Sequence, residues 1–258
     1  MVEATQWLLQ TGVLNNISLK YQATNISYGD EHPALTGTFY NSVMCRHNYI
    51  MYVCMNYGDI CRFLRIGLIN GKTEFMFDKT KSQLFPSSIS SSYRYVGNIL
   101  ADDTYLYVSS GYYSNPVTIM KIDINTGEVR SFTDTNTGDS HKNTGGGVMF
   151  WDDNMNIHIM VRSGPLVFNT STESFDTSLL TSSSFASNHT NDITKTKYHY
   201  IYHTCNSSSL KCYNILTKTA TTITLAASMY TCGAYDDVND KIYLLGKTSE
   251  SGKLYTMT

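Results

Sequence analysis

The sequence predicts an all-β chain folded as a five-bladed β-propeller, in which each blade is a four-stranded antiparallel sheet. A unit of four short apolar or aromatic segments recurs along the chain, and its second segment begins near Tyr49, Tyr105, Asn156, Tyr198 and Lys241. These starts lie roughly 40 to 55 residues apart, as in propeller repeats. The composition, with 20 Tyr and only 4 Pro among 258 residues, also favours strands over helices.

The clearest copy of the unit runs from Tyr95 to Phe132. Its expected strands cover residues 95–101, 105–108, 118–124 and 128–132. Asp102 and Asp103 suit the turn between the first two strands, because short polar side chains bond nearby backbone groups. Equivalent first turns are Arg46-His47-Asn48, Asp152-Asp153-Asn154, Lys195-Thr196-Lys197 and Asp236-Asp237. A second turn series joins strands three and four at Asn70-Gly71, Asn125-Thr126-Gly127, Asn169-Thr170 and Thr217-Lys218.

The last copy of the unit has only three strands, since residues 253–257 supply its third. Residues 17–24 alternate apolar and polar side chains and precede the first complete unit, which is the pattern of a half-buried strand. We expect this segment to pair into the C-terminal blade and close the ring, removing an exposed edge. Residues 1–258 then form a single domain with 1–16 as a lead segment, and four or six blades remain the alternative counts.

The segment Ile122-Asp-Ile-Asn-Thr-Gly-Glu-Val129 resembles the repeat motif of kelch-like and quinoprotein-like propellers. The resemblance extends over nearly the whole chain, although neither a WD dipeptide nor a kelch double glycine recurs at the expected places. Five-bladed propellers include sugar-binding lectins, glycoside hydrolases and virion tail proteins. The resemblance therefore implies a fold and a choice among binding, enzymatic and structural roles.

Charge and hydropathy exclude several classes of function. A net charge of -2 and a pI near 6.4 provide no basic face for nucleic acid. The apolar run Trp7-Leu8-Leu9 is too short for a signal peptide or membrane anchor, so we expect cytoplasmic synthesis without membrane insertion. The same run is a candidate docking handle for a protein partner, or packs beneath the ring.

Neither the histidines nor the cysteines predict a metal or cofactor. His199 and His203 lie on one predicted strand and point to the same side about 13 Å apart, too far for one ion. Cys54 with Cys61, and Cys205 with Cys212, share a spacing of 7 residues, and we expect both pairs at equivalent places on strands two and three of their blades, facing across a hairpin. Each pair is close enough for a disulfide under oxidation, but buried reduced thiols are expected in a chain without an export signal.

Candidate ligand-binding residues lie in the loops that converge near the axis of a propeller. These loops combine aromatic faces, which stack on sugar rings, with amide, carboxylate and guanidinium groups that bond hydroxyls. The candidates are Tyr57, Asp59, Tyr93, Arg94, Tyr112, Tyr113, Asn115, His141, His189 and Tyr230. No catalytic residue is predicted, because most Asp residues belong to turns and only Asp59, with Asp192 as a companion, suits an axial carboxyl pair.

The leading hypothesis is a non-enzymatic propeller used for attachment or assembly. Low charge and abundant Asn, Ser, Thr and Tyr favour a virion tail, baseplate or fibre component that binds protein partners, a surface glycan or both. A soluble carbohydrate-binding lectin is the alternative, and a propeller glycoside hydrolase is the second alternative. Unequal loops in the repeats favour a single binding site over one site in each blade.

Overall fold

The strands of this chain form consecutive antiparallel sheets. The structure is a computed structural model that describes residues 39–91, 94–110, 117–136, 138, 147–181, 192–203, 207–246 and 254–257. The first sheet contains β1 (Phe39–His47), β2 (Ile50–Tyr57), β3 (Ile60–Gly67) and β4 (Thr73–Thr80). The second sheet contains β5 (Val96–Ala101), β6 (Tyr105–Ser110), β7 (Thr118–Asp123) and β8 (Val129–Thr133).

The remaining strands continue the same neighbour-to-neighbour order. The third sheet contains β9 (Met149–Trp151), β10 (Ile157–Val161), β11 (Gly164–Asn169) and β12 (Ser174–Asp176). A six-stranded sheet follows, with β13 (Asp192–Lys195), β14 (His199–His203), β15 (Ser207–Asn214), β16 (Thr219–Asp236), β17 (Lys241–Gly246) and β18 (Leu254–Met257). The chain is therefore all-β in its described part, apart from short helical turns such as α2 (Lys81–Leu84).

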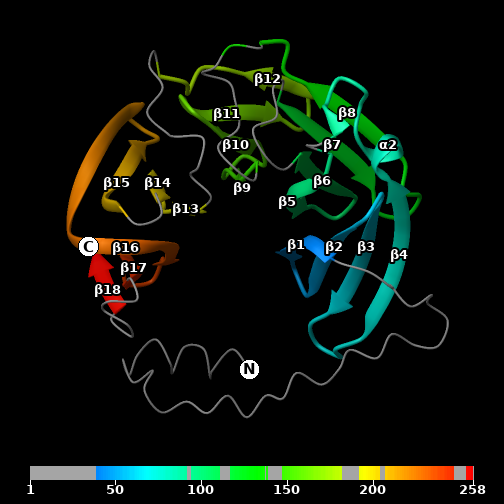
Figure 1. Cartoon of the computed structure of the whole chain (residues 1–258), viewed down its shortest axis with the longest axis horizontal. Helices are drawn as coiled ribbons and strands as arrows, with labels where there is room; N and C mark the ends of the chain where they lie inside the picture. The colour runs from blue at the N-terminus through cyan, green and yellow to red at the C-terminus, as the bar shows by residue number, and fades with distance from the viewer. Residues whose placement is uncertain are drawn as a thin grey trace.

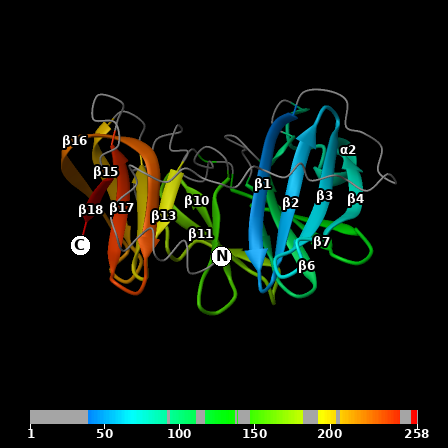
Figure 2. The ribbon, with the colours of Figure 1, turned by 90° about the horizontal axis from the view of Figure 1, so that it is seen from below.

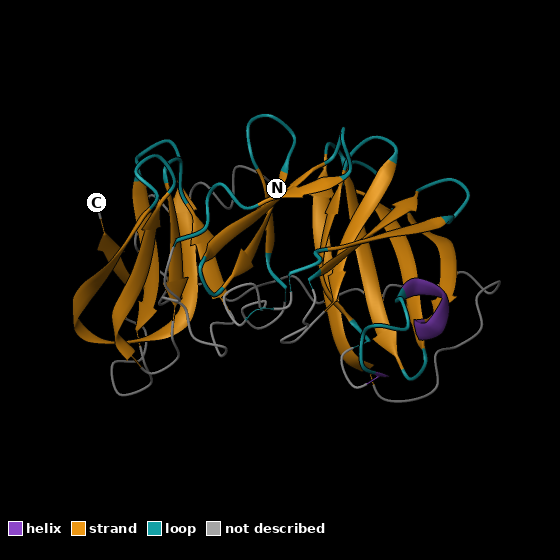
Figure 3. Ribbon diagram, turned by 90° about the horizontal axis from the view of Figure 1, so that it is seen from above, coloured by secondary structure: helices purple, strands orange, loops and turns teal. Residues whose placement is uncertain are grey.

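The sheets stand side by side along an arc around a common centre (Figure 1). The first strands β1, β5 and β9 lie nearest the centre, and the last strands β4, β8 and β12 lie on the outside. Figure 2 shows that the strands run along the direction of view of Figure 1. In Figure 3 the helix α2 lies on the side opposite to most of the described turns.

The predicted strand starts agree with the structure to within one residue. The second strands begin at Ile50, Tyr105, Ile157, His199 and Lys241. The main difference is β16, which pairs with β15 through Thr219–Thr224 and with β17 through Gly233–Asp236, so that two expected units share one bent strand. Residues 219–232 contain no Gly, Pro, Asn or Asp to end a strand, and register shifts take up the bend.

Apolar clusters fill the spaces between consecutive sheets. Ile99, Leu106 and Met120 of the second sheet belong to one cluster with Tyr52 and Cys54 of the first. A second cluster joins the second and third sheets, and a third cluster links Met160 of the third sheet to tyrosines of β14 and β15. Burial of these faces provides the main driving force for stacking the sheets.

The turns between third and fourth strands share one chemical pattern. Asp123 accepts hydrogen bonds at Oδ1 from the backbone N–H groups two and three residues later, and Asn169 and Asn214 do the same. Four residues after each of them comes a residue with a left-handed backbone, namely Gly127 (φ 70°), Glu173 (φ 54°) or Lys218 (φ 56°). The predicted turns are confirmed in these three groups of strands, where the capping residue is the Asp or Asn that ends β7, β11 or β15, whereas β3 ends at Gly67.

The predicted equivalence of the two cysteine pairs is wrong. Cys61 is the second residue of β3, whereas Cys212 is the sixth residue of β15, and Cys205 lies outside the described residues. Cys54 is opposite Phe63 and Cys61 is opposite Asn56, so the first pair is diagonal on one sheet face. Both are free thiols with no exposed surface, and burial raises the pKa of Cys54 well above its usual value.

Candidate ligand-binding groove

A groove with a volume of about 560 Å³ lies between the outer strands of the second and third sheets. Strand β8 and the residues that follow it form one wall, and β12 with its preceding turn forms the other. The lining includes Ser131, Phe132, Asp134, Asn136, Glu173 and Phe175. Because β8 and β12 each pair with only one described strand, the groove runs between two sheet edges.

Three phenylalanine rings pack across the groove floor. The ring centroids of Phe132 and Phe168 are 5.3 Å apart, and those of Phe168 and Phe175 are 5.2 Å apart. Phe168 is fully buried, whereas Phe132 and Phe175 remain partly exposed and line the groove. The tilted packing of the rings holds them in fixed orientations, so the groove has a rigid aromatic surface.

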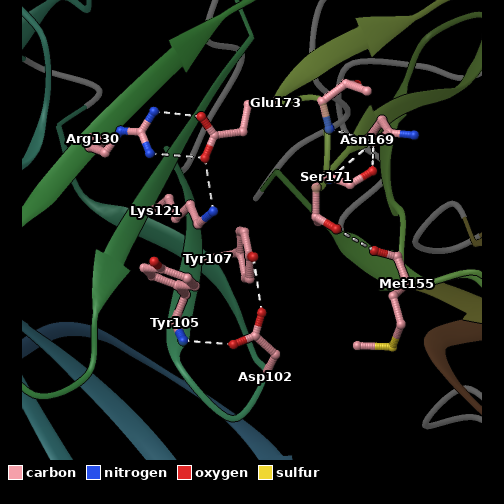
Figure 4. A network of polar contacts seen from close by, with 11 residues as sticks. Asp102, Tyr105, Tyr107, Lys121, Arg130, Met155, Asn169, Ser171 and Glu173 are labelled. Atoms are coloured by element: carbon pink, nitrogen blue, oxygen red, sulfur yellow. Dashed lines mark hydrogen bonds and ion pairs between the residues drawn. The ribbon is translucent and has the colours of Figure 1, made fainter.

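An ion cluster between the two sheets fixes a carboxylate at the groove (Figure 4). Glu173 accepts a hydrogen bond from Lys121 Nζ at 2.8 Å and is bridged by two nitrogens of Arg130 at 3.0 and 2.5 Å. Lys121 is 8% exposed, and its Nζ also lies 4.1 Å from the ring centre of Tyr105. The Lys121 hydrogen bond and the Arg130 charge hold the pKa of Glu173 below its usual range.

Local turn chemistry delivers Glu173 to this position. Asn169 Oδ1 accepts hydrogen bonds from the Ser171 hydroxyl at 2.7 Å and from the Thr172 backbone N–H at 2.8 Å. The Thr170 hydroxyl donates to the carbonyl oxygen of Met155 at 2.8 Å, which joins this turn to the turn before β10. Glu173 has a left-handed backbone conformation, and its side chain extends to Lys121 of the second sheet.

A second turn supports the other side of the cluster. Asp102 Oδ1 accepts backbone hydrogen bonds from Thr104 at 2.7 Å and Tyr105 at 2.6 Å. Its Oδ2 accepts a hydrogen bond at 3.0 Å from the Tyr107 hydroxyl, whose pKa burial raises above its usual value. Tyr105 and Tyr107 are thus held beside Lys121 by a turn whose Asp is needed for backbone capping.

The groove presents hydrogen-bond acceptors and hydroxyl groups. Asp134 is 6% exposed and accepts a hydrogen bond from the Asn136 backbone at 3.1 Å. Ser131, Thr135 and Ser174 are exposed and carry hydroxyls that both donate and accept. A neutral polar ligand with one apolar face fits this combination of oxygens and phenyl rings.

Three of the predicted ligand-binding residues have described side chains, and none of them lines this groove. Tyr57 ends β2, and Asp59 is exposed in the turn before β3. Arg94 donates from Nε to the Ile89 carbonyl at 2.9 Å and from Nη2 to the Ser87 carbonyl at 3.3 Å, so it holds its own loop together.

The other predicted ligand-binding residues cannot be placed. Six lie outside the described residues: Tyr93, Tyr112, Tyr113, Asn115, His141 and His189. Tyr230 lies on β16, but its side chain is outside the described set, as is that of Asp192 on β13. A ligand role for the axial loops therefore stays a prediction.

Sequence reasoning missed the groove because its residues come from two sheet edges that only folding brings together. Asp134 follows the expected strand at residues 128–132, and Glu173 follows a segment expected only to be a turn. A usable signal was the aligned turn pattern, in which Glu173 occupies the position held by Gly127 in the preceding sheet. A charged residue at a left-handed position is uncommon and indicates a specific role.

The described residues contain no cluster of three metal-ligating side chains. His199 and His203 are both on β14 as predicted, and His199 Nε2 lies 2.9 Å from Asn214 Nδ2. Among the described residues no helix is long and apolar enough to cross a membrane.

Comparisons with known proteins show similarity at the level of fold. No protein-family model matches the chain, and no curated protein matches its sequence. Among solved structures, the extracellular domain of a B. thetaiotaomicron protein named as a one component system has 18% identity and a TM-score of 0.55, with 83% of this chain and 27% of that chain covered. Another structure of the same domain, named there as part of a hybrid two component system, has 19% identity and a TM-score of 0.53, with 79% and 26% covered.

The extracellular domain of another hybrid two component system from B. thetaiotaomicron has 18% identity and a TM-score of 0.47, with 81% of this chain and 25% of that chain covered. The chain thus spans about a quarter of the length of these structures. At such identities the two alignments above a TM-score of 0.5 show a shared all-β arrangement of successive antiparallel sheets and carry no information on ligands.

Proposed function

We propose that the chain is a five-bladed β-propeller whose last blade is completed by residues 17–24. Three four-stranded sheets and the two halves of the six-stranded sheet give five repeated groups along an arc (Figure 1). Strand β16 serves as the last strand of the fourth group and the first strand of the fifth. Residues 17–24 lie outside the described residues, so the closing strand is part of the proposal.

We further propose that this propeller is a non-enzymatic binding module and that a surface glycan is its ligand. The observation that carries the proposal is the groove between β8 and β12, where exposed hydroxyls and a fixed carboxylate surround the partly exposed rings of Phe132 and Phe175. Sugars offer an apolar ring face for stacking and hydroxyls that donate to carboxylates. The setting predicted from composition, a virion attachment or assembly component, stays a prediction.

The pKa of the Glu173 carboxyl group favours a role as a hydrogen-bond acceptor over a role as a catalytic acid. A hydrolase requires one carboxyl group that keeps its proton near neutral pH. The Lys121 and Arg130 contacts lower the pKa of Glu173, so this carboxylate is charged and serves as an acceptor.

A glycan-array screen of the full chain, followed by calorimetry with any sugar that binds, tests the proposal. Phe175→Leu keeps most of the apolar volume but removes the aromatic face, and we expect it to weaken binding at least about tenfold. Phe77→Leu is the matched control, because Phe77 packs on Phe63 at 5.0 Å in the first sheet, away from the groove. A triple variant, Tyr57→Ala with Tyr112→Ala and Tyr113→Ala, tests the axial loops.

The outcomes separate the possible sites. Binding that is lost in Phe175→Leu and kept in the other two variants supports the groove. Binding lost only in the triple variant places the ligand at the axial loops and refutes the groove assignment. If no glycan binds the folded protein, the glycan proposal is wrong and a structural role within an assembly takes its place.

A further inference from the structure

One face of the first sheet is largely apolar and is partly exposed. The strand registers place Met44, Val53 and Leu64 in one row across this face, with Met51 and Ile66 in the adjacent row. Met44 is 61% exposed, and Met51, Val53 and Ile66 are half-buried, whereas Leu64 in the middle of the face is only 4% exposed. The opposite face of the sheet packs against the second sheet through Tyr52, Cys54 and Phe63.

The equivalent positions on the second strands of the following sheets are completely buried. A repeated backbone hydrogen bond between the two turns aligns the first sheet with the second, since Leu68 donates to Tyr49 and Ile124 donates to Thr104. Met51 and Val53 therefore correspond to Leu106 and Val108 of the second sheet, and the same alignment gives Ile157 and Ile159 of the third sheet and Tyr200 and Tyr202 of β14. All six of these counterparts have no exposed surface.

From this contrast we infer that the fifth group of strands packs against the apolar face of the first sheet. This group consists of the second half of β16, β17, β18 and residues 17–24. In the second and third sheets and in β14, the corresponding face contacts the preceding group. The first sheet has no preceding group in sequence order, so the last group is its counterpart in a ring. This inference deepens the proposed propeller and does not depend on any ligand.

The arrangement of the described strands favours this occupant over a second copy of the chain. The partly exposed face points away from the second sheet, toward the opening that Figure 1 shows between β1–β4 and β16–β18. Among the described residues, strand β18 pairs only with β17. Its other edge is therefore available to a further strand. Ile17, Leu19 and Tyr21 alternate with polar residues, as a strand at this edge requires.

Methionine oxidation followed by mass spectrometry tests the inference, because the chain contains its own reference residues. Met155 is 48% exposed and Met120 is fully buried, so they define the fast and slow rates. If the face were open, Met44 at 61% exposure would oxidise at least as fast as Met155. We expect Met44 and Met51 in the full chain to oxidise at least about tenfold more slowly than Met155, at every protein concentration.

Deletion of residues 17–24 should raise the oxidation rates of Met44 and Met51 toward that of Met155, while Met120 stays protected. If the deletion also exposes Met120, the protein has unfolded, and Leu19→Asp in the full chain replaces the deletion. Fast oxidation of Met44 in the full-length monomer would overturn the inference. Protection of Met44 that disappears on dilution would also overturn the inference, because it assigns the face to a second copy of the chain. Protection that survives both the deletion of residues 17–24 and Leu19→Asp would overturn it as well. The inference rests on the proposed propeller and not on the proposed ligand, and glycan binding is a separate measurement, so its failure is distinguishable from failure of the proposed glycan site.

Discussion

Replacing Asn56 with alanine should destabilise the protein at the contact between the first and second sheets. Asn56 is 1% exposed on β2, and its side chain holds the backbone of Val96 on β5. Its Oδ1 accepts from the Val96 N–H at 2.8 Å, and its Nδ2 donates to the Val96 carbonyl at 3.0 Å. The side chain thus acts as a substitute for a neighbouring strand where two sheets meet.

The expected cost follows from the groups left behind. Asn56→Ala removes two side-chain hydrogen bonds from the backbone of Val96, which has no exposed surface, and removes the acceptor of the Cys61 thiol. Each unsatisfied buried backbone group costs about 1–3 kcal/mol. Allowing for partial relaxation, we expect the free energy of unfolding to fall by about 3 kcal/mol, a large part of the ~5–15 kcal/mol of a typical domain.

Equilibrium urea unfolding of the full chain measures this loss as a lower midpoint with an unchanged m-value. The matched control is Asn125→Ala, because Asn125 is exposed in the turn between β7 and β8 and should change stability by no more than about 0.5 kcal/mol. A loss below about 1 kcal/mol for Asn56→Ala would refute the reasoning. It would mean that water or a shifted strand satisfies Val96 without the amide.

Three further predictions concern the ion cluster, a buried histidine and a turn. Glu173→Gln leaves the buried ammonium group of Lys121 facing a neutral amide. We expect the free energy of unfolding in urea to fall by about 2 kcal/mol, which is less than for a fully buried ion pair because Arg130 is exposed. An unchanged unfolding midpoint would contradict this prediction. Burial lowers the pKa of His158 in the folded protein. The contribution of neutral His158 to the free energy of unfolding is therefore complete above a pH of about 6.5, and it is lost as the pH falls below that value. His158→Gln should therefore flatten the dependence of unfolding free energy on pH between about 5 and 7, and an unchanged slope would exclude His158 as its source. Gly127→Ala places a side chain on a backbone with φ of 70° and should lower the unfolding free energy by about 1 kcal/mol, which the same urea titration detects.

Local signals in the sequence were sufficient to predict the repeat and its turns. The second strands and the Asp- and Asn-capped turns depend on residues a few positions apart, and the structure confirms them. Strand β16 was harder, because a shared strand between two sheets depends on how the sheets are oriented. A segment from Thr219 to Cys232 without turn-forming residues was the only local indication.

The candidate site was not predictable in the same way. Its walls come from β8 and β12, and its carboxylate is fixed by Lys121 and Arg130 of another sheet. Nothing local in the sequence pairs Glu173 with Lys121, which lies in a different repeat. Most of the residues chosen from the axial loops lie outside the described residues, so only the functional variants can compare the two locations.

The turn between the third and fourth strands contains one position with a left-handed backbone. The residue at this position explains how equivalent sheets acquire different interfaces. In the second sheet this position is Gly127, and an added Cβ would lie 3.3 Å from the Phe77 ring of the first sheet. In the third sheet it is Glu173, which crosses to Lys121, and in the next group it is Lys218, whose Nζ donates to the Ser178 carbonyl at 2.8 Å. Each turn therefore contacts the preceding sheet from the same backbone position, and the side chain placed there sets the chemistry. A glycine permits close packing, whereas a glutamate introduces a carboxylate beside an aromatic groove, so a binding site can arise at one interface without altering the repeat that builds the fold.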